Sequence, residues 1–556
     1  MQAGFSPARV RAARRGAQIA RVLSSRGDVG LLGEIAMKQI TTSSASRGAV
    51  GAVLLALLVA PVSGAGTSEW IGGAGAWNVA GNWRNGVPTA GDVARIPAGG
   101  PAVGAGTAAP CAALRISATG ERDAWCMVDG GELSVETHLG VGGAGPGNFL
   151  LSAGFVKCDG WITVGSTGSG LWTQSGGSVE ADQLLLANAL NKDGTWKLSG
   201  GAVEADELIV GSLGNGLFAQ TGGTVHVSKL TLAEGLLATG TYTLKRGTLC
   251  VTGSLHIGGK GHAVLGLDGR GTVKAQRLHM GSPLGTSSLL IDGLLAAANK
   301  PMVKVVDRMT VGDNASIVLD GTHAADGPIL LDVTGELDFD ALANNVNVHL
   351  GRKARVRCGK VTNAQGDLRG KGKFEPAAAP IGAAGPFFTG AAGLTIAPGL
   401  PETEDLYGTL EIGGDTHLDR AIIVMDLGPV PGEELAVPGS THDSLVVEGS
   451  ITFVEGRVAL SLPEDIVTLA AALDAQVDPN APDVEFNAQL PEAMAIFANQ
   501  AAEYLAPYAI IEASEILGCY EVESPAGLPS WLAFKVELLE DGGWQRLVVR
   551  LSPNYR

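Results

Sequence analysis

The chain has 556 residues, of which 81 are glycine, 45% are hydrophobic and 17% are charged, and its formal net charge is −17. This hydrophobic content is sufficient for a packed core, which excludes a chain that is disordered throughout. A polyanion repels the phosphate backbone, so nucleic acid is not an expected partner.

Residues 1–65 are expected to be a leader and secretory signal peptide that does not belong to the fold. An apolar run over residues 49–60 follows an arginine-rich segment and precedes small residues, the order typical of a signal peptide. The run is shorter than the roughly 20 residues that a membrane span requires. We therefore expect an exported protein, extracellular or at the cell surface, whose mature chain has no membrane span. Translation could start at Met1 or at Met37, which would open a signal peptide of more usual length.

Residues 66–127 are expected to form N-terminal capping coils. Trp70, Trp77 and Trp83 stand among glycines at the start of this segment. Large aromatic side chains at the open end of a stacked structure seal its core. An aromatic platform that binds a sugar is the alternative role for these tryptophans.

A repeat of 22–24 residues predicts a parallel β-solenoid over residues 128–281. Seven copies open on a glycine, and the second and fourth residues after each glycine are apolar. Alternating apolar residues are typical of a strand with one buried face, so each coil of about 23 residues holds two or three short strands. One coil cannot bury its apolar face alone, but stacked coils share a continuous core. The opening glycines are Gly131, Gly154, Gly177, Gly201, Gly223, Gly247 and Gly271.

An aromatic residue precedes the opening glycine in four consecutive copies. Equivalent positions of adjacent coils lie about 4.8 Å apart, so we expect these side chains to stack as a column that serves packing. Glycines at the corners are expected to have positive φ, where the chain turns between faces. The four aromatic residues are Phe149, Trp172, Trp196 and Phe218.

The rest of the chain is predicted to continue the solenoid and then cap it. Residues 282–462 contain short apolar runs with irregular turns, which indicate an irregular continuation. Residues 463–505 are predicted to be a helical insertion, with one helix opening after Pro463 and a second after Pro491. Residues 506–556 return to a strand pattern and are expected to be a C-terminal β cap.

Several motifs together resemble those of large secreted bacterial β-helix proteins with autotransporter-associated β-strand repeats. The resemblance covers most of residues 67–462 and implies a pectin-lyase-like parallel β-solenoid, for which we expect a right-handed β-helix. No strand series typical of an outer-membrane barrel follows the cap, so self-translocation is not expected. The motifs are the tryptophan-rich opening at 70–96, L-T-I-A-P-G at 394–399, G-T-L-E-I-G-G-D at 408–415, D-S-L-V-V-E-G at 443–449 and G-R-V-A-L-S-L at 456–462.

The candidate metal ligands are Asp159, Asp182 and Asp206, each five residues after its opening glycine, with Glu180 and Glu204 two residues before the latter pair. Stacking would place these like charges about 4.8 Å apart, which is unfavourable unless a cation or water screens them. They are weak candidates for Ca²⁺ binding, and a solvated acidic face is the alternative. No other cofactor is predicted.

A basic stripe lies between residues 352 and 373. Alternation with apolar residues indicates that its side chains point outward. The stripe could bind an acidic glycan or a neighbouring molecule, or it could serve only as solubilising surface charge. Its members are Arg352, Lys353, Arg355, Arg357, Lys360, Arg369, Lys371 and Lys373.

The cysteines and histidines indicate no further site. Cys111 and Cys126 are the only cysteines close in sequence, and export would permit a disulfide between them. His256, His262 and His279 have no metal-type spacing and are expected to be scattered surface residues.

These features favour a non-catalytic structural or adhesin-like protein of the cell surface, whose partners are extracellular glycans or proteins. The alternative is a β-helix protein that binds or degrades polysaccharide, as a lyase or a hydrolase. Such an enzyme needs paired carboxylates, or a carboxylate-bound Ca²⁺ with basic residues, in a groove. The short glycine-rich turns predict a smooth surface instead.

Overall fold

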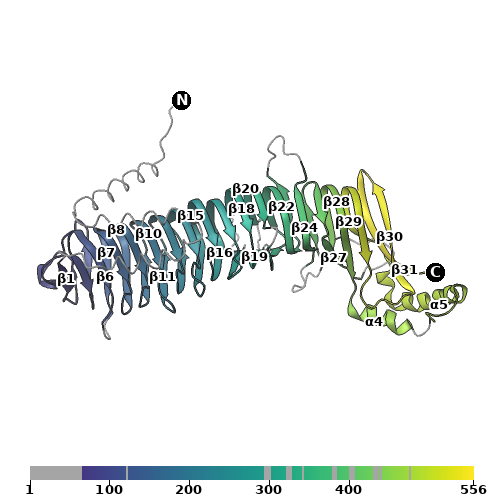
Figure 1. Ribbon diagram of the computed structural model, residues 1–556, viewed down its shortest axis with the longest axis horizontal. Helices are drawn as coiled ribbons and strands as arrows, with labels where there is room; N and C mark the ends of the chain where they lie inside the picture. The colour runs from purple at the N-terminus through teal and green to yellow at the C-terminus, as the bar shows by residue number, and fades with distance from the viewer. Residues whose placement is uncertain are drawn as a thin grey trace, which may run out of the picture. The chain divides into compact units, whose positions relative to one another are not determined.

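A computed structural model describes residues 66–119, 123–292, 302–320, 329–340, 343–377, 385–399, 407–429, 438, 441–474 and 477–555. The predicted leader and signal peptide, residues 1–65, lie outside this set. Residues from Ala65 onward form one compact unit. This unit is a parallel β-solenoid of about 13 turns with coils of about 24 residues, which confirms the predicted fold class (Figure 1).

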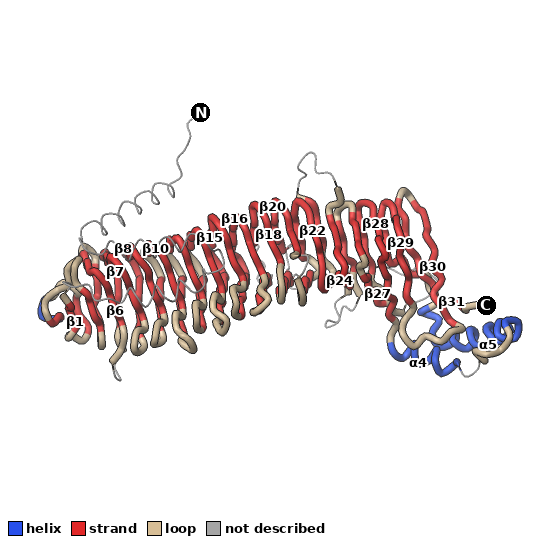
Figure 2. The backbone as a smooth tube through the Cα atoms, viewed as in Figure 1, coloured by secondary structure: helices blue, strands red, loops and turns tan. Residues whose placement is uncertain are grey.

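Each regular coil has three strand faces. One coil consists of β9 (Gly170–Gln174) and β10 (Ser178–Leu186), and β10 covers two faces because its ladder to the preceding coil shifts register between Ala181 and Gln183. β9 and β10 both pair in parallel with β8 (Gly147–Val164), and on the other side with β11 (Asp193–Leu198) and β12 (Ala202–Val210). Every coil is therefore hydrogen-bonded to two neighbours, and Figure 2 shows the loops gathered at the ends of the strands.

The remaining strands continue this stacking in both directions. Before β8 lie β1 (Thr67–Trp70), β2 (Ala74–Ala76), β3 (Trp83–Arg84), β4 (Val93–Ile96), β5 (Gly100–Gly104), β6 (Ala108–Ile116) and β7 (Trp125–Val141), with a 3-10 turn, η1 (Ala80–Asn82). After β12 lie β13 (Asn215–Gln220), β14 (Thr224–Leu232), β15 (Thr239–Ile257), β16 (His262–Met280), β17 (Thr286–Asp292), β18 (Met302–Val311), β19 (Ala315–Asp320), β20 (Ile329–Phe339), β21 (Asn347–Leu350), β22 (Ala354–Gly370), β23 (Lys373–Pro376), β24 (Phe388–Ala397), β25 (Thr409–Ile412), β26 (Thr416–Asp419), β27 (Ile422–Asp426) and β28 (Ser444–Ser461).

The apolar positions of the repeat form the core, as predicted. All fourteen residues at the second and fourth positions after the opening glycines are buried, with Ala181 the most exposed at 7%. The aromatic column is also confirmed as packing: the ring centroids of successive members from Phe149 to Phe218 are 3.9, 4.2 and 5.8 Å apart, and the rings are nearly parallel. Tyr242 extends the column by one coil, 4.8 Å from Phe218.

The three tryptophans of the opening segment seal the first coils. Trp70, Trp77 and Trp83 are each at most 3% exposed. Their rings meet edge to face, with centroids 5.0 Å apart for Trp70 and Trp83 and 4.8 Å apart for Trp77 and Trp83. The Trp83 indole donates a hydrogen bond of 2.7 Å to the carbonyl oxygen of Trp77. Because these rings are buried against one another, they do not form a sugar-binding platform.

A column of glycines makes the corner between two faces. Gly201 has a φ of 85°, and a Cβ at this position would overlap the carbonyl oxygen of Gly177 in the coil below. Gly177, with a φ of 65°, has the same relation to Gly154. The repeat therefore requires glycine here for two reasons: the backbone conformation and the close approach of the next coil.

Two helices follow the last regular strand. α4 (Glu464–Leu473) begins directly after Pro463, as predicted. The predicted start of the second helix is wrong, because α5 (Asp483–Ala501) begins after Pro482 and contains Pro491 in its interior. Its buried stripe explains why the helix continues past the proline: buried residues recur every three or four positions on both sides of it. They are Phe486, Leu490, Ala493, Phe497 and Ala501. A 3-10 turn, η3 (Ala502–Tyr504), ends the segment.

The final strands reverse the direction of pairing. β29 (Tyr508–Glu523) is parallel to β28 and so continues the solenoid. β31 (Trp544–Pro553) pairs with β29 in antiparallel fashion, and β30 (Leu532–Asp541) pairs with the other side of β31. The spatial order is therefore β28, β29, β31, β30, with β30 outermost.

The glycine corner gives a first prediction. Gly201→Ala forces a residue with a Cβ into a left-handed conformation and against the backbone of the neighbouring coil. We expect the free energy of unfolding to fall by at least about 2 kcal/mol, measured by urea denaturation monitored by circular dichroism.

The matched control is Gly266→Ala in β16, where φ is not positive and a Cβ would meet no atom within 4 Å. This substitution should change the free energy of unfolding by no more than about 0.5 kcal/mol. Equal effects of the two substitutions would show that the corner does not need glycine.

Candidate functional site

One strand face carries on its outward side Glu180 and Glu204 of the acidic candidates, and Arg355, Arg357 and Lys373 of the basic stripe. Lys360 and Arg369 lie on the other two faces. Along the face of Glu180 the ladders align one outward residue from each coil, which we call the outer column. Adjacent strands lie about 4.8 Å apart, so successive side chains of the column are within contact distance. Its members are Ser134, Lys157, Glu180, Glu204, His226, Cys250, Lys274, Lys304, Asp332, Arg357 and Glu375.

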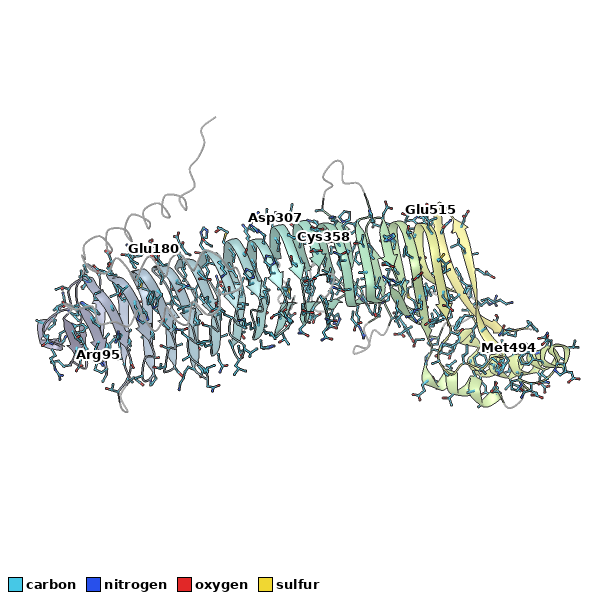
Figure 3. The ribbon with its side chains drawn as sticks, viewed as in Figure 1. Arg95, Glu180, Asp307, Cys358, Met494 and Glu515 are labelled. Carbon is cyan, nitrogen blue, oxygen red and sulfur yellow. The ribbon has the colours of Figure 1, made fainter. Side chains whose placement is uncertain are left out.

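The acidic candidates do come together, but a lysine lies at their edge. Glu180 is opposite Glu204 in the next coil and opposite Lys157 in the preceding coil, and Figure 3 labels Glu180 on the early coils. The Lys157 ammonium is 2.6 Å from the carboxylate of Asp159. This hydrogen bond, with the attraction of Asp159, Glu180 and Asp182, raises the pKa of Lys157 above its usual range. Lys157, which the sequence reasoning missed, therefore offsets part of the acidic charge.

The register also places Asp182 and Asp206 in equivalent positions of adjacent coils, since Ala181 is opposite Ala205 and Gln183 opposite Glu207. The Gln183 amide donates a hydrogen bond of 2.6 Å to Glu207. No group of three or more histidine, cysteine, aspartate or glutamate side chains in the described part of the chain is arranged to hold a metal ion. Ca²⁺ binding by Asp159, Asp182 and Asp206 stays a prediction.

The basic stripe is interleaved with carboxylates. Arg355 and Arg357 point outward, as predicted, while Val356 and Cys358 between and after them are buried. Glu375 lies 3.5 Å from Arg355 and 2.9 Å from Arg357. On the other two faces Lys360 pairs with Glu336 and Arg369 with Asp367. On the face of Arg355, Lys373 pairs with both Glu411 and Glu448. The stripe is therefore a set of ion pairs and not a uniformly positive surface.

Many of these ion pairs join one coil to the next. Arg308 contacts Glu336 at 3.2 Å and Asp338 at 2.8 Å, and Glu336 also contacts Lys360, at 3.2 Å, in the following coil. Although burial alone would raise the pKa of Glu336, hydrogen bonds from Thr362 and Lys360 and the charges of Lys360 and Arg308 lower it. An exposed pair contributes at most about 1 kcal/mol, but a network shares the ordering cost among its members.

Further pairs extend this network toward the N-terminal coils. Arg277 lies 3.6 Å from Asp307, which is labelled in Figure 3, and Lys304 lies 4.0 Å from Asp332. Arg277, Arg308, Glu336 and Lys360 occupy one ladder position in four successive coils. The pairing of Arg308 with Glu336 and of Glu336 with Lys360 was not visible in the sequence, because 28 and 24 residues separate the partners.

Two histidines that were expected to be scattered lie together. His256 and His279 are opposite each other in adjacent coils, with parallel rings whose centroids are 5.0 Å apart. Burial, with the charges of His279 and Lys229, lowers the pKa of His256 to about 4. They are 23 residues apart in sequence, which is the length of one coil, and this spacing could have predicted that they are neighbours.

A buried polar cluster, which the sequence reasoning missed, lies where the solenoid meets the last strands. His442, Asp443 and Ser444 are each at most 1% exposed. The Asp443 carboxylate accepts hydrogen bonds from the backbone N–H groups of Gly408 (2.9 Å) and Asp426 (3.1 Å). These bonds tie the start of β25 and the end of β27 to the start of β28.

The same cluster reaches the final strands. The Nε2 atom of His442 lies 2.9 Å from the carbonyl oxygen of Ala509, and its ring packs edge to face on Tyr508, with centroids 5.3 Å apart. The Tyr508 hydroxyl donates a hydrogen bond of 2.9 Å to the carbonyl oxygen of Gly428. A polar run, T-H-D-S at 441–444, directly before an apolar strand was the available signal for this cluster.

Burial raises the pKa of the Asp443 carboxyl to about 7. The two backbone hydrogen bonds and the charge of Lys371 act in the opposite direction, while the charge of Asp426 raises the pKa further. Both described hydrogen bonds of the Asp443 carboxylate come from backbone groups at strand ends, so this side chain holds those strands together.

The cysteines are all thiols. Cys111 and Cys126, the pair predicted to be able to form a disulfide, are both buried and unbridged. Burial raises the pKa of each thiol well above its usual range, so neither is a reactive nucleophile.

No protein-family model and no curated protein sequence matches the chain significantly. Within the described residues no helix has both the length and the apolar content needed to cross a bilayer. What the chain does is therefore inferred from its own side chains.

The buried carboxyl gives a second prediction. Its pKa is higher in the folded state than its ordinary value of 3.8, so folding takes up a proton between about pH 4 and pH 7. As pH rises through this window, the free energy of unfolding of the wild type should fall relative to that of Asp443→Asn, by at most about 1.4 kcal/mol for each pH unit.

The measurement is urea denaturation of both proteins at several pH values. Histidines with lowered pKa, such as His256, affect both proteins equally and cancel in the difference. The Asn side chain that replaces Asp443 cannot accept both backbone hydrogen bonds, so we expect the free energies of unfolding of the two proteins to differ also by an amount that does not depend on pH. A difference that does not vary with pH would contradict the burial of a titrating carboxyl.

Proposed function

We propose that the protein is a secreted or cell-surface β-solenoid with a structural, adhesin-like and non-catalytic role, of the kind implied by its resemblance to proteins with autotransporter-associated β-strand repeats. The observation that carries the proposal is the coil-to-coil ion pairing of the outward face. Charged side chains such as Arg308, Glu336 and Lys360 contact one another across coils at 2.8–3.2 Å. They reinforce the stack and are not left available for a small charged substrate.

The interior supports the same role. The aromatic column and the parallel ladders run in the stacking direction, so a force along that direction is shared by the many hydrogen bonds and ring contacts between each pair of adjacent coils. A small cavity lies in the core among apolar side chains including Phe339, Phe374 and Phe388. Extracellular glycans or proteins are the expected partners, which would bind the outer faces.

A second candidate is a polysaccharide lyase or hydrolase, and one observation favours it. Glu180 and Asp182 on one coil stand beside Glu204 and Asp206 on the next. The stacking distance of about 4.8 Å is close to the roughly 5–5.5 Å between the two carboxyl groups of retaining glycosidases. This candidate and the structural role differ in whether a polysaccharide is cleaved.

The test is a panel of acidic and neutral polysaccharides, with and without Ca²⁺, in which depolymerisation and binding are both scored for the purified chain. We expect no depolymerisation of any polysaccharide. Depolymerisation that is lost in Asp182→Asn with Asp206→Asn would replace the structural proposal by the enzymatic one. The matched control is Asp193→Asn, an exposed carboxyl on β11, which should leave any cleavage unchanged.

A further inference from the structure

The two ends of the solenoid differ in their edge strands. At the N-terminal end the edges are short, since β2 has three residues and β3 has two, and the three tryptophans lie beside them. At the other end β30 has ten residues and, in the described part of the chain, pairs only with β31. Figure 1 shows β30 and β31 at the end of the row of strands. A long unpaired edge presents N–H and C=O groups that can pair with another strand.

The side chains of this edge are exposed and apolar in part. All residues from Lys535 to Asp541 are exposed, including Val536 at 41% and Leu538 at 46%. Lys535 and Glu537 alternate with these apolar residues and have no ion-pair partner in the described chain. Natural edge strands are usually protected by shortness, proline, charged side chains or a covering segment. β30 has charges at Lys535 and Glu537 but is ten residues long and contains no proline, and no described strand pairs with its outer edge.

The turn between β30 and β31 determines which backbone groups of β30 point away from the sheet. Asp541 and Trp544 flank a two-residue turn, Gly542-Gly543, in which both residues have positive φ. The residues that flank such a turn form a hydrogen-bonded pair, and hydrogen bonding then alternates along the strand. The odd-numbered residues of β30 therefore bond to β31, and the N–H and C=O groups of Phe534, Val536 and Leu538 point outward.

We propose that two copies of this chain pair through this edge, with their β30 strands antiparallel and a two-fold axis at Val536. In this register Val536 faces Val536 of the second copy, and Phe534 faces Leu538. Lys535 faces Glu537 twice, once on each side of the axis. The outward backbone groups of Phe534, Val536 and Leu538 are the ones that form the hydrogen bonds of this register, so backbone direction and side-chain charge agree.

Neighbouring registers lack this complementarity. A shift that centres the axis on Lys535 places the two Lys535 side chains opposite each other, and a shift to Glu537 does the same for the two glutamates. Like charges directly opposite on adjacent strands are destabilising. Centring on Phe534 leaves Lys535 and Glu537 opposite uncharged residues. Centring on Leu538 places Lys535 opposite Asp541 but Glu537 opposite Leu539. The register centred on Val536 is therefore the one in which Lys535 and Glu537 both face an opposite charge.

The proposed contact closes on itself. A two-fold interface uses the same surface of both copies, so pairing consumes the free edge of β30 and no fibre grows through that edge. The result is a continuous sheet in which β31 and β30 of one copy are followed by β30 and β31 of the second. The net charge of −17 opposes association, and salt screens both this repulsion and the Lys535–Glu537 attraction.

The test uses charge exchange at the axis and sedimentation velocity of the full chain at micromolar concentration. The wild type should sediment as a dimer. Lys535→Glu places two glutamates opposite each other twice, and Glu537→Lys does the same with lysines. Each variant alone should raise the dimer dissociation constant at least about tenfold. The double exchange, Lys535→Glu with Glu537→Lys, restores both attractive pairs and should restore the dimer.

A mixture of the two single variants supplies the decisive measurement. Neither should pair with itself, but Lys535→Glu can pair with Glu537→Lys, because every contact then joins a glutamate to a lysine. Labelled with a donor and an acceptor fluorophore, the two variants should show energy transfer only when mixed with each other. Energy transfer in the mixture would also show that both variants are folded, because the pairing requires a folded β30.

Three results would overturn the proposal. They are a monomeric wild type at all concentrations, a dimer whose mass is unaffected by the single exchanges, and single variants that do not pair on mixing. A wild type that remains monomeric but captures a strand of another protein would show that the edge has a different occupant.

Discussion

The rest of the structure depends on the parallel stacking of one coil on the next. Each coil is hydrogen-bonded to both neighbours, so the backbone of one coil is the template for the following one. Stacking at about 4.8 Å leaves no room for a Cβ at the corner, which explains why Gly177 and Gly201 recur there. It also forces side chains at equivalent positions into contact. Phe149, Trp172 and Trp196 stack in the core for this reason, and the charges of Arg308, Glu336 and Lys360 pair outside for the same reason.

The core of a solenoid must be covered at both ends, and this chain covers its two ends with different structures. At the first coils, buried tryptophans and short strands cover the core. At the last coils, His442 and Asp443 join the solenoid to β29 through buried hydrogen bonds, and antiparallel strands follow. These antiparallel strands leave the outer edge of β30 open. A surface structural role and association through that edge are compatible, because the interface is distant in sequence from the charged outer column.

The candidate site illustrates what stacking does to charge. Residues that appeared in sequence as an acidic ladder and a basic stripe lie, in the structure, on the outward sides of the strands beside residues of opposite charge. Lys157 lies beside Asp159, and Glu375 lies between Arg355 and Arg357. These partners lie on other coils or outside the acidic and basic runs of the sequence. A list of the acidic or basic residues along the sequence therefore overestimates the net charge of each part of the surface.

The sequence by itself determined the solenoid, its repeat length, its buried positions and the aromatic column, because these depend on a local alternation that recurs every 22–24 residues. It also located α4, whose start has a proline and two acidic residues. Only the tertiary structure decided the rest. α5 continues through Pro491 because its apolar stripe packs on both sides of that residue. The pairing of Glu336 with Arg308 and Lys360, the burial of Asp443 and the open edge of β30 all depend on which strands become neighbours, and neighbours one coil or more apart are specified by three-dimensional packing and not by local pattern.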